Sequence, residues 1–525
     1  MSAIPAVPAS SPASSPVWSI DPRTGEQREQ VGVEAAPEVV DAAVRAAHAA
    51  RGALADRTLR AAFLRSAADQ LERGRDEFIA TADAETALGA TRLTGELART
   101  CYQLRSFADT VDDGAFLDVI ISHPDASATP PVPDLRRYKI PLGVVAVYSA
   151  SNFPFAFSVA GGDTASALAA GCPVVVKAHP DHPATSELAA AALRRAAAEH
   201  GIPEGVVGLV HGFDAGVALV EHPLVAAAGF TGSVRGGRAL FDAAAARPVP
   251  IPFHGELGSL NPVWVTEAAA AERPEEIGSG LAASMTMGVG QFCVKPGLVL
   301  APAGAAGDQL VKALGQSLAD VDAGVMLDHR MRDSFLAGVA ARTQLPYVEA
   351  PLAPGPGSEH TVAPGFLTVP VAPLLQEDGP YALLLEECFG PVTVVARYAD
   401  ASEAEALLAR LPGNLTATLH VSTAEASGET SGADGGTDLV ARLTPLAGRI
   451  LVNAWPTGVA VAPAQHHGGP YPATTSTSTS VGSTAAERWL RPVAYQNTPE
   501  ALLPPELREN NPLGLPRTVD GRREG

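Results

Sequence analysis

The sequence is poor in cysteine, and this shortage limits the kind of protein it can encode. Only four cysteines occur in 525 residues. They form no C-x-x-C pair and no Cys/His spacing of the zinc-binding type, so neither a disulfide framework nor a metal site is expected. A reducing compartment fits this use of cysteine best, and we predict a cytoplasmic protein without a bound metal.

Positive charge is also scarce. Lys and Arg number 37 against 57 Asp and Glu, which gives a formal net charge of −20. Nucleic acids and anionic membranes attract basic surfaces, so neither is expected as a partner. An anionic small molecule would need a local cationic site.

Long uninterrupted apolar runs are absent as well. Residues 140–162 carry no charge over 23 positions, which is long enough to cross a bilayer. However, prolines and polar residues interrupt this stretch, and Asn152-Phe153-Pro154 would break a helix. A buried strand, a turn and a buried helix are expected here instead. The first 16 residues contain no basic residue and no apolar core, so they do not resemble a signal peptide.

Strands and helices alternate along the chain, which predicts an α/β fold. Residues 37–96 have a helical pattern, with apolar residues recurring at intervals of three and four. Apolar strands separated by helices follow, and their expected ranges are 142–148, 173–177, 206–211 and 225–230. A second alternating block comes after Glu256, with expected strands at 297–301, 392–398 and 449–453. Two connecting segments are predicted as loops, at 351–364 and 425–436.

Cys293 and Glu256 are the first candidates for chemistry. Cys293 ends the glycine-containing stretch MGVGQFC, and Glu256 lies upstream among apolar and glycine neighbours. A thiolate can attack a carbonyl, and a carboxylate can deprotonate the water that releases the acyl group. The apolar surroundings are expected to raise the pKa of Glu256, which suits a base. Each residue alone could equally be an inert buried cysteine or a surface glutamate.

Other short motifs suggest a nucleotide site. Lys177 ends an apolar strand, and ligands of doubly wound sheets bind at such strand ends. Residues 230–237 follow a strand and open a helix, where free amides attract phosphate, although they lack the G-x-G-x-x-G pattern. Asn152 offers an amide at a strand-to-helix turn, as in many oxyanion holes. Glu387 precedes another turn, and a carboxylate can accept hydrogen bonds from ribose hydroxyls.

Taken together and in this order, these motifs resemble the NAD(P)-dependent aldehyde dehydrogenase superfamily over roughly residues 18–497. Within it, four stretches are similar to the branch of α-ketoglutarate semialdehyde (2,5-dioxopentanoate) dehydrogenases and NADP-dependent fatty aldehyde dehydrogenases. These stretches are SNFP at 151–154, AGGDTASAL at 160–168, HGGPYPATT at 467–475 and RWLRP at 488–492.

The resemblance implies an aldehyde dehydrogenase-like α/β fold with two Rossmann-type α/β domains and a small bridging β element. The cofactor-binding domain would comprise residues 18–120 and 142–255, and the catalytic domain residues 256–461. The bridging element would comprise residues 121–141 and 462–497. A flexible arm at 1–17 and a polar tail at 498–525 would flank these parts. Family members are usually homodimers or homotetramers built through the bridging element.

The resemblance also implies roles for the candidate residues. Cys293 would be the nucleophile, Glu256 the general base, and Asn152 with the Cys293 amide the oxyanion hole. The predicted cofactor-binding residues are Lys177 and Glu387 on the two riboses, Thr231, Gly232, Ser233 and Gly237 along the pyrophosphate path, and Phe389 beside the nicotinamide ribose. Many members have a glycine where Ser259 stands, and we expect this serine to contribute no essential group.

The residues after Lys177 bear on the choice of cofactor. NAD-preferring members often carry an acid three residues after the lysine, where this chain has Pro180. A missing acid would admit a 2′-phosphate, so NADP is the predicted cofactor and NAD the alternative. His179 or His182 would assist the phosphate.

The predicted reaction is oxidation of a small-molecule aldehyde to a carboxylate through a thiohemiacetal and a thioester on Cys293. The expected substrate is 2,5-dioxopentanoate, giving 2-oxoglutarate, and fatty or other aliphatic aldehydes are the alternative. A cysteine-dependent ester hydrolase is an alternative of another class, although it would not need Lys177 or Glu387. An acidic substrate would require a cationic anchor, and the sequence does not choose among the arginines.

Overall fold

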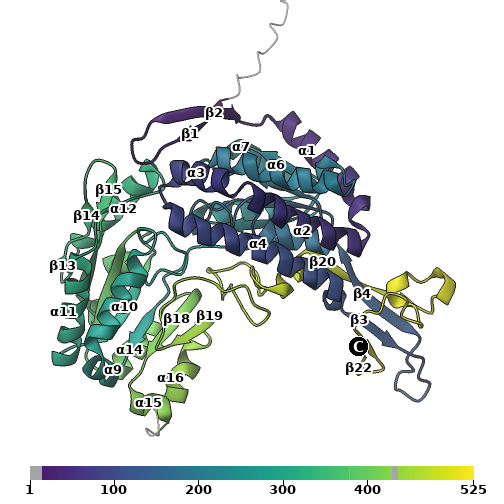
Figure 1. Cartoon of the computed structure of the whole chain (residues 1–525). Helices are drawn as coiled ribbons and strands as arrows, with labels where there is room; N and C mark the ends of the chain where they lie inside the picture. The colour runs from purple at the N-terminus through teal and green to yellow at the C-terminus, as the bar shows by residue number, and fades with distance from the viewer. Residues whose placement is uncertain (1–14, 378, 429–435, 525) are drawn as a thin grey trace, which may run out of the picture.

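The computed structural model describes residues 15–377, 379–428 and 436–524. Most of the expected flexible arm and residues 429–435 of the expected loop at 425–436 therefore lie outside the described residues. In Figure 1 the N-terminal domain lies at the top, the catalytic domain at the lower left and a smaller sheet at the lower right.

A five-stranded parallel sheet forms the first α/β domain. Its strands follow the order β7-β6-β5-β8-β9, and every neighbouring pair is parallel. The strands are β5 (Val144–Tyr148), β6 (Val174–Lys177), β7 (Val207–Val210), β8 (Val225–Thr231) and β9 (Phe253–Glu256). The chain runs outward from β5 to β7 and then returns to β8 on the other side of β5. This reversal creates a crevice at the carboxyl ends of the strands, where such sheets bind ligands.

Helices cover both faces of this sheet. Val145 and Val147 of β5 pack in one apolar cluster with helices of one face, and Val144 and Ala146 face a second cluster on the other. Strands buried on both faces appear in a sequence as continuous apolar runs, which explains why the pattern at 142–148 was informative. The helices are α1 (Pro37–Ala50), α2 (Arg57–Arg73), α3 (Arg75–Thr86), α4 (Ala90–Asp113), α5 (Gly162–Ala170), α6 (Pro183–Glu199), α7 (Phe213–Glu221) and α8 (Val234–Ala246).

A seven-stranded sheet forms the second α/β domain, in the order β13-β16-β17-β11-β10-β18-β19. All neighbours are parallel except the edge strand β13, which runs antiparallel to β16. The strands are β10 (Val263–Val265), β11 (Leu298–Pro302), β13 (Glu349–Leu352), β16 (Gly365–Pro370), β17 (Val392–Tyr398), β18 (Asn414–His420) and β19 (Ala447–Val452). The accompanying helices are α9 (Glu267–Glu272), α10 (Pro274–Thr286), α11 (Ala305–Ala319), α12 (His329–Thr343), α13 (Val371–Leu374), α14 (Ala401–Leu408), α15 (Thr423–Ser427) and α16 (Gly436–Leu443).

The sequence located only some of these strands. The predictions at 297–301, 392–398 and 449–453 are confirmed as β11, β17 and β19, whereas β10, β16 and β18 were missed. The prediction of a loop at 351–364 is wrong in part. Besides the end of β13, this segment holds β14 (Gly355–Pro356) and β15 (Thr361–Ala363), which form a small antiparallel sheet with β12 (Gly324–Val325). Such short strands between Gly and Pro residues leave no alternating pattern to read.

A third sheet projects from the N-terminal domain, in the order β20-β4-β3-β21-β22 (Figure 1). Its strands are β3 (Val119–Ser122), β4 (Leu135–Pro141), β20 (Leu490–Gln496), β21 (Arg517–Val519) and β22 (Arg522–Glu524). Antiparallel pairing of β4 with β20 joins the two segments that were expected to form the bridging element.

The prediction of a separate polar tail at 498–525 needs correction. Within it, β21 pairs in parallel with β3, and β22 continues the sheet. Three leucines anchor this segment in the core of the N-terminal domain, namely Leu503, Leu507 and Leu515. His123 further contacts Asp520 at 2.8 Å. The polar composition of the segment concealed these widely spaced apolar anchors.

Two other expectations can be compared with the structure. Residues 16 and 17 of the expected arm belong to β1 (Pro16–Ile20), which pairs antiparallel with β2 (Gln27–Val33). The uncharged stretch 140–162 is built as predicted, with β5 followed by a turn and the start of α5. Among the described residues, no helix combines the length and the apolar character needed to cross a membrane.

Candidate functional site

A cavity of about 570 Å³ opens at the carboxyl ends of the first sheet, between the two α/β domains. The last residues of four strands line it: Tyr148, Lys177, Thr231 and Glu256. Cys293, Glu387 and Phe389 line it from the catalytic domain. The predicted residues that line the cavity are Asn152, Lys177, Thr231, Gly232, Ser233, Glu256, Cys293, Glu387 and Phe389.

Gly237 is the exception, because it is not among the residues that line this cavity. A Cβ atom at this position would lie 2.1 Å from Leu257 and 2.9 Å from Phe230. The glycine therefore lets α8 pack closely against Phe230 and Leu257, which line the cavity. Its neighbour Gly236 lines the cavity instead.

The turn before α8 lines the cavity. Ser233 caps the helix by accepting a hydrogen bond from the Gly236 amide at 3.2 Å. Thr231 and Gly232 precede it, and the Gly232 amide donates to the Glu256 carbonyl at 3.0 Å. The unpaired amides of a helix start and its dipole favour an anion at this end. This turn can therefore hold a pyrophosphate.

Two charged side chains lie at opposite parts of the cavity wall. Burial lowers the pKa of Lys177 to about 8, and its Nζ lies 4.7 Å from the centre of the Phe213 ring. Burial raises the pKa of Glu387 to about 7, against the opposing charge of Lys295. Gly258 makes room for this carboxylate, because a Cβ there would approach Glu387 Oε2 to 2.5 Å. Both side chains can form hydrogen bonds to ribose hydroxyls.

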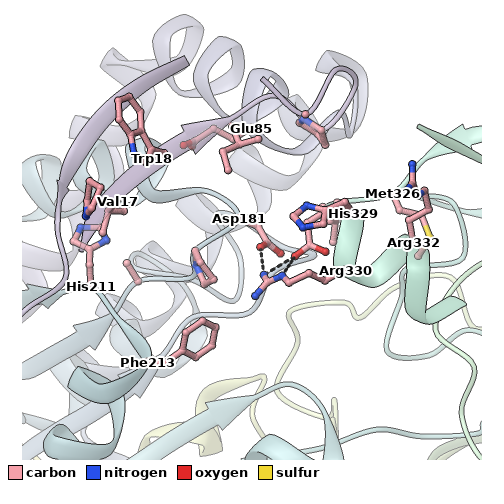
Figure 2. A pocket seen from close by; sticks show the side chains of 18 of the residues that line it. Val17, Trp18, Glu85, Asp181, His211, Phe213, Met326, His329, Arg330 and Arg332 are labelled. Carbon is pink, nitrogen blue, oxygen red and sulfur yellow. Dashed lines mark hydrogen bonds and ion pairs between the residues drawn. The ribbon is translucent and has the colours of Figure 1, made fainter. Parts of the chain in front are cut away.

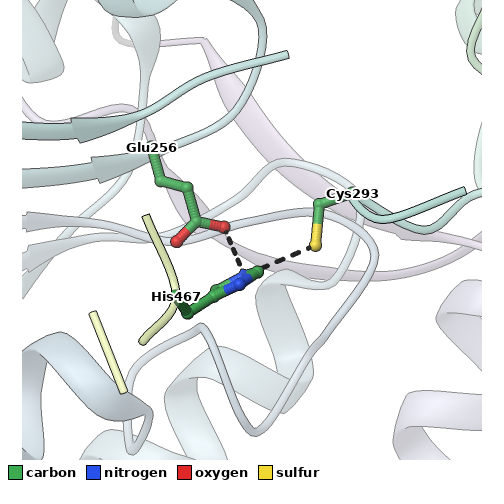
Figure 3. Close-up of side chains that lie close together, drawn as sticks. All are labelled: Glu256, Cys293 and His467. Carbon is green, nitrogen blue, oxygen red and sulfur yellow. Dashed lines mark hydrogen bonds and ion pairs between the residues drawn. The ribbon is translucent and has the colours of Figure 1, made fainter. Parts of the chain in front are cut away.

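Two of the residues that line the cavity, Glu256 and Cys293, form a compact cluster with His467 (Figure 3). His467 Nε2 lies 2.8 Å from Glu256 Oε1 and 3.7 Å from Cys293 Sγ. The contact with Glu256 has the distance of an ion pair, although its direction is not that of a regular hydrogen bond. Ser480 donates a hydrogen bond to the other carboxylate oxygen at 2.7 Å. Glu256 and His467 are both buried.

The surroundings shift the pKa of both reactive groups. Burial, together with the charges of Glu256 and Glu387, raises the pKa of the Cys293 thiol well above its usual range. Burial also acts to raise the pKa of Glu256, but the charge and hydrogen bonding of His467, with that of Ser480, outweigh it and lower the pKa. The expectation of a raised pKa for Glu256 is therefore wrong. The sequence showed its apolar neighbours but not the histidine that comes from 211 residues further along the chain.

The loop before Cys293 is a tight turn of unusual backbone. Gly288, Val289 and Gly290 all have positive φ angles, of 56°, 59° and 67°. A side chain at Gly290 would clash with the backbone of Gly390 at 2.3 Å. Asn152 Nδ2 donates to the Gln291 carbonyl at 2.8 Å, which fixes its amide beside this loop. Its second N–H can be offered to an oxyanion.

A buried polar network supports Cys293 from below. Asn261 Nδ2 donates to the Cys293 carbonyl at 2.8 Å and to the Lys295 carbonyl at 3.1 Å. Ser259 Oγ donates to Asn261 Oδ1 at 2.8 Å and accepts from the Leu415 amide at 2.9 Å. Ser259 Oγ also lies 3.3 Å from Asn414 Oδ1, so the serine contacts three groups, of which Asn261 in turn holds the Cys293 carbonyl. The expectation that this serine contributes no essential group stays a prediction.

A second cavity of about 650 Å³ adjoins the first and shares Lys177 with it. It lies between β1 and the start of α12, as Figure 2 shows. Arg330 bridges its floor by contacting Asp181 at 3.1 Å and Asp328 at 2.6 Å. Pro180, the residue expected to admit a 2′-phosphate, lines this second cavity.

The two histidines expected to assist a phosphate are poorly suited to it. His182 is fully buried, and its Nε2 lies 2.9 Å from the Ala150 carbonyl. His179 stacks on it with 5.7 Å between ring centres. Burial lowers the pKa of both rings, that of His179 well below its usual range. Neutral imidazoles offer an anion no charge, so this part of the expectation is not supported.

Sequence reasoning missed His467 as a functional residue. The motif HGGPYPATT contributed to the resemblance, but its histidine received no role. A histidine directly before two glycines is a signal that could have been followed, because such a turn can bring the ring close to another segment. Its ring nitrogen, Glu256 and Cys293 offer ligand atoms within 4.8 Å of one another, a spacing that a metal ion could bridge. The expectation of no metal stays a prediction.

The chain is similar to known proteins over most of its length. The model of the aldehyde dehydrogenase family matches residues 9–429. An alpha-ketoglutaric semialdehyde dehydrogenase 2 of Azospirillum brasilense is 47% identical over 478 residues, which cover 89% of this chain and 87% of the relative. An alpha-ketoglutaric semialdehyde dehydrogenase of Acinetobacter baylyi is 43% identical over 88% of this chain and 86% of the relative.

The fold agrees as well. The crystal structure of methylmalonate-semialdehyde dehydrogenase (DddC) from Oceanimonas doudoroffii matches this chain with a TM-score of 0.76 at 20% identity. The match covers 93% of this chain and 96% of that one. At this identity the likeness concerns the fold alone. Together with the family match over most of the length, it leads to one conclusion: the chain belongs to the aldehyde dehydrogenase family, whose members use NAD(P).

Proposed function

We propose that this enzyme oxidises 2,5-dioxopentanoate to 2-oxoglutarate with NADP as the preferred cofactor. The observation that carries the proposal is the Cys293–His467–Glu256 cluster, two of whose residues line a cavity that suits a dinucleotide. The names of the two similar bacterial relatives support the substrate, and the uncharged Pro180 supports the cofactor.

The residues around the cavity fit a dinucleotide. The amides at the start of α8 would hold the pyrophosphate, and Lys177 and Glu387 would hold the two riboses. Gly258 lets Glu387 approach the cavity, which a larger residue would prevent. When bound, the nicotinamide accepts the hydride that the substrate carbon loses.

Activation of the thiol is the first step that the chain itself must supply. Because the pKa of Cys293 is raised, the sulfur carries its proton at neutral pH. The neutral form of His467, whose Nε2 lies 3.7 Å from the sulfur, accepts that proton, and Glu256 at 2.8 Å stabilises the imidazolium that results. The thiolate then forms a C–S bond to the aldehyde carbon, and the carbonyl oxygen becomes an oxyanion. Asn152 Nδ2 and the Cys293 amide donate hydrogen bonds to it.

Loss of hydride from the same carbon leaves a thioester on Cys293. Glu256 removes a proton from a water molecule, and the resulting hydroxide attacks the thioester carbonyl. The C–S bond breaks, the carboxylate leaves and the thiolate is restored. The low pKa of Glu256 means that it is ionised and ready to accept this proton at neutral pH.

Steady-state kinetics test this proposal. The ratio kcat/KM should be highest for 2,5-dioxopentanoate when it is compared with hexanal and a long-chain aldehyde, each with NADP and with NAD. A higher value for the neutral aldehydes would move the enzyme to the aliphatic alternative. Hydrolysis of a nitrophenyl ester that does not require Lys177, with no reduction of either cofactor, would favour the hydrolase.

We also propose that the enzyme is a cytoplasmic homodimer or homotetramer assembled through the sheet that contains β20 and β22. The two outer strands of this sheet leave backbone groups at its edges, which another chain can pair with. Light scattering on the purified protein should give a multiple of the chain mass of 53.7 kDa. A mass of one chain would contradict the proposal.

A further inference from the structure

Two arginines near Cys293 have guanidinium nitrogens without protein partners. Arg99 belongs to α4 and Arg449 to β19. Within the described residues, Nη1 and Nη2 of Arg99 and Nε and Nη2 of Arg449 are buried and donate no hydrogen bond. Buried polar groups are almost always paired, so four such nitrogens need an explanation. A ligand that brings its own oxygens would provide one.

The two side chains are held next to each other by one loop. Arg99 Nε donates to the carbonyl of Val459 at 3.2 Å, and Arg449 Nη1 donates to that of Gly458 at 2.8 Å. These carbonyls belong to consecutive residues. One nitrogen of each guanidinium therefore fixes its position, and the other nitrogens are free to bind the same ligand.

Contacts lead from this pair to the reactive sulfur. The Arg99 guanidinium lies 5.3 Å from the centre of the Phe157 ring, which lies 6.0 Å from the ring of His467. His467 in turn contacts Cys293 at 3.7 Å. Burial lowers the pKa of both arginines, and it is opposed at Arg99 by the charges of Glu96 and then Cys293, and at Arg449 by that of Cys293. Both cations therefore lie within electrostatic reach of the sulfur.

Arg92, which lies on the same face of α4 as Arg99, makes different contacts. Arg92 lies 4.7 Å from the centre of the Phe292 ring and donates to the Asn152 carbonyl. It also contacts Glu96 at 3.9 Å. Arg92 therefore braces Asn152 and is partly neutralised, whereas Arg449 has no carboxylate within ion-pair distance among the described residues.

We propose that Arg99 and Arg449 together bind the carboxylate of a short oxo-acid whose aldehyde carbon lies at Cys293. Guanidinium groups bind carboxylates through paired, charge-assisted hydrogen bonds. In 2,5-dioxopentanoate four C–C bonds of about 1.5 Å separate the two ends, so the extended molecule spans about 5 Å. Arg99 and Arg449 would thus favour an aldehyde that carries a carboxylate over a neutral aldehyde of equal length. This inference rests on the proposed function and names the residues that give it its substrate class.

Substitution of each arginine by methionine tests the inference. The variants R99M and R449M keep much of the side-chain length but lose the donors. The ratio of kcat/KM for 2,5-dioxopentanoate to kcat/KM for pentanal should fall about 10- to 100-fold in each, mainly through KM. R99K should restore part of the ratio. The matched control is R105M, because Arg105 also belongs to α4 but forms exposed ion pairs with Asp69 and Glu72, and its ratio should equal that of the wild type.

A second measurement does not need turnover. Glutarate, a dicarboxylate of the same length, should protect Cys293 of the wild type against iodoacetamide, and the concentration for half protection should rise about 10- to 100-fold in R99M and R449M. Unchanged ratios and unchanged protection in both variants would overturn the inference while leaving the proposed function intact. A wild type that prefers pentanal would instead refute the proposed substrate, and with it the anchor.

Discussion

The two sides of Cys293 are built in different ways. On the cofactor side, the cavity is lined by the ends of parallel strands and by the first turn of α8, so backbone groups and strand-end side chains dominate. On the substrate side, Arg99, Phe157, Arg449 and His467 come from segments far apart in the chain.

This difference separates what the fold provides from what the individual chain adds. Any doubly wound sheet has a crevice at its switch point, so a dinucleotide site there follows from topology. The side chains around the substrate follow from no such rule, because a fold can carry many different sites. We therefore expect substitutions on the cofactor side to change nucleotide binding and those on the substrate side to change reactivity and selectivity.

The largest expected effect is that of H467Q on the reactivity of Cys293. Glutamine fills a similar volume but cannot accept the thiol proton, so kcat should fall about 100- to 10,000-fold, the usual contribution of a general acid–base group. The rate of Cys293 alkylation by iodoacetamide, followed against pH, should move to higher pH because burial and Glu256 then keep the thiol protonated.

The neighbouring variant H466Q is the control for this experiment, since His466 takes no part in the cluster. An alkylation profile of H467Q that coincides with that of the wild type would show that Glu256 alone activates the sulfur. In that case the substrate side would contribute selectivity only, and the comparison between the two sides would be weaker.

The next largest effect is expected for N152A. Removing one oxyanion donor typically costs about 100- to 1000-fold in kcat. Because Asn152 Nδ2 also holds the Gln291 carbonyl at 2.8 Å, the loop before Cys293 must be checked separately. The alkylation rate of Cys293 at neutral pH should stay close to that of the wild type. A matching fall in alkylation and turnover would mean that Asn152 supports the loop rather than the oxyanion.

Sequence reasoning reached the cofactor side far more completely than the substrate side. Lys177 and Thr231 end recognisable apolar strands, so their positions at one edge of a sheet follow from local pattern. Arg99 and Arg105 both belong to α4, but they lie beyond the helical pattern predicted at 37–96, and the sequence does not tell which one faces Cys293. Their difference depends on the packing of α4 against the loop at 458–459, which local pattern does not encode. Gly237 is an exception on the cofactor side, because it was predicted to line the cofactor path but instead allows close packing of α8.

Glu387 offers a test on the cofactor side through pH. Burial raises its pKa in the folded protein to about 7, above the usual value of a glutamate, so ionisation is less favourable there. The cost of ionisation is absent below about pH 4.5 and grows as the pH rises towards 7, reaching about 1 to 3 kcal/mol. The variant E387Q should therefore gain stability relative to the wild type at pH 8 compared with pH 5, in urea unfolding without cofactor.

Glu386, the exposed neighbour of Glu387, provides the control. The variant E386Q should differ from the wild type in stability by the same amount at pH 5 and pH 8. The same E387Q variant should raise the KM for NADP while changing alkylation of Cys293 little. If E387Q instead altered alkylation strongly and KM hardly at all, the division of labour between the two sides would not hold.

The smallest expected effect is that of S259A, which lies beneath Cys293 rather than on either side of it. The substitution removes the acceptor of the buried Leu415 amide, held at 2.9 Å, and a buried group left unpaired costs about 1 to 3 kcal/mol of stability. Turnover should fall less than about 10-fold, because Asn261 still holds the Cys293 carbonyl at 2.8 Å. N261A should lower kcat more than S259A does, since Asn261 contacts the cysteine directly. Equal losses in the two variants would mean that Ser259 sets the position of Asn261, and that the support under the sulfur acts as one unit.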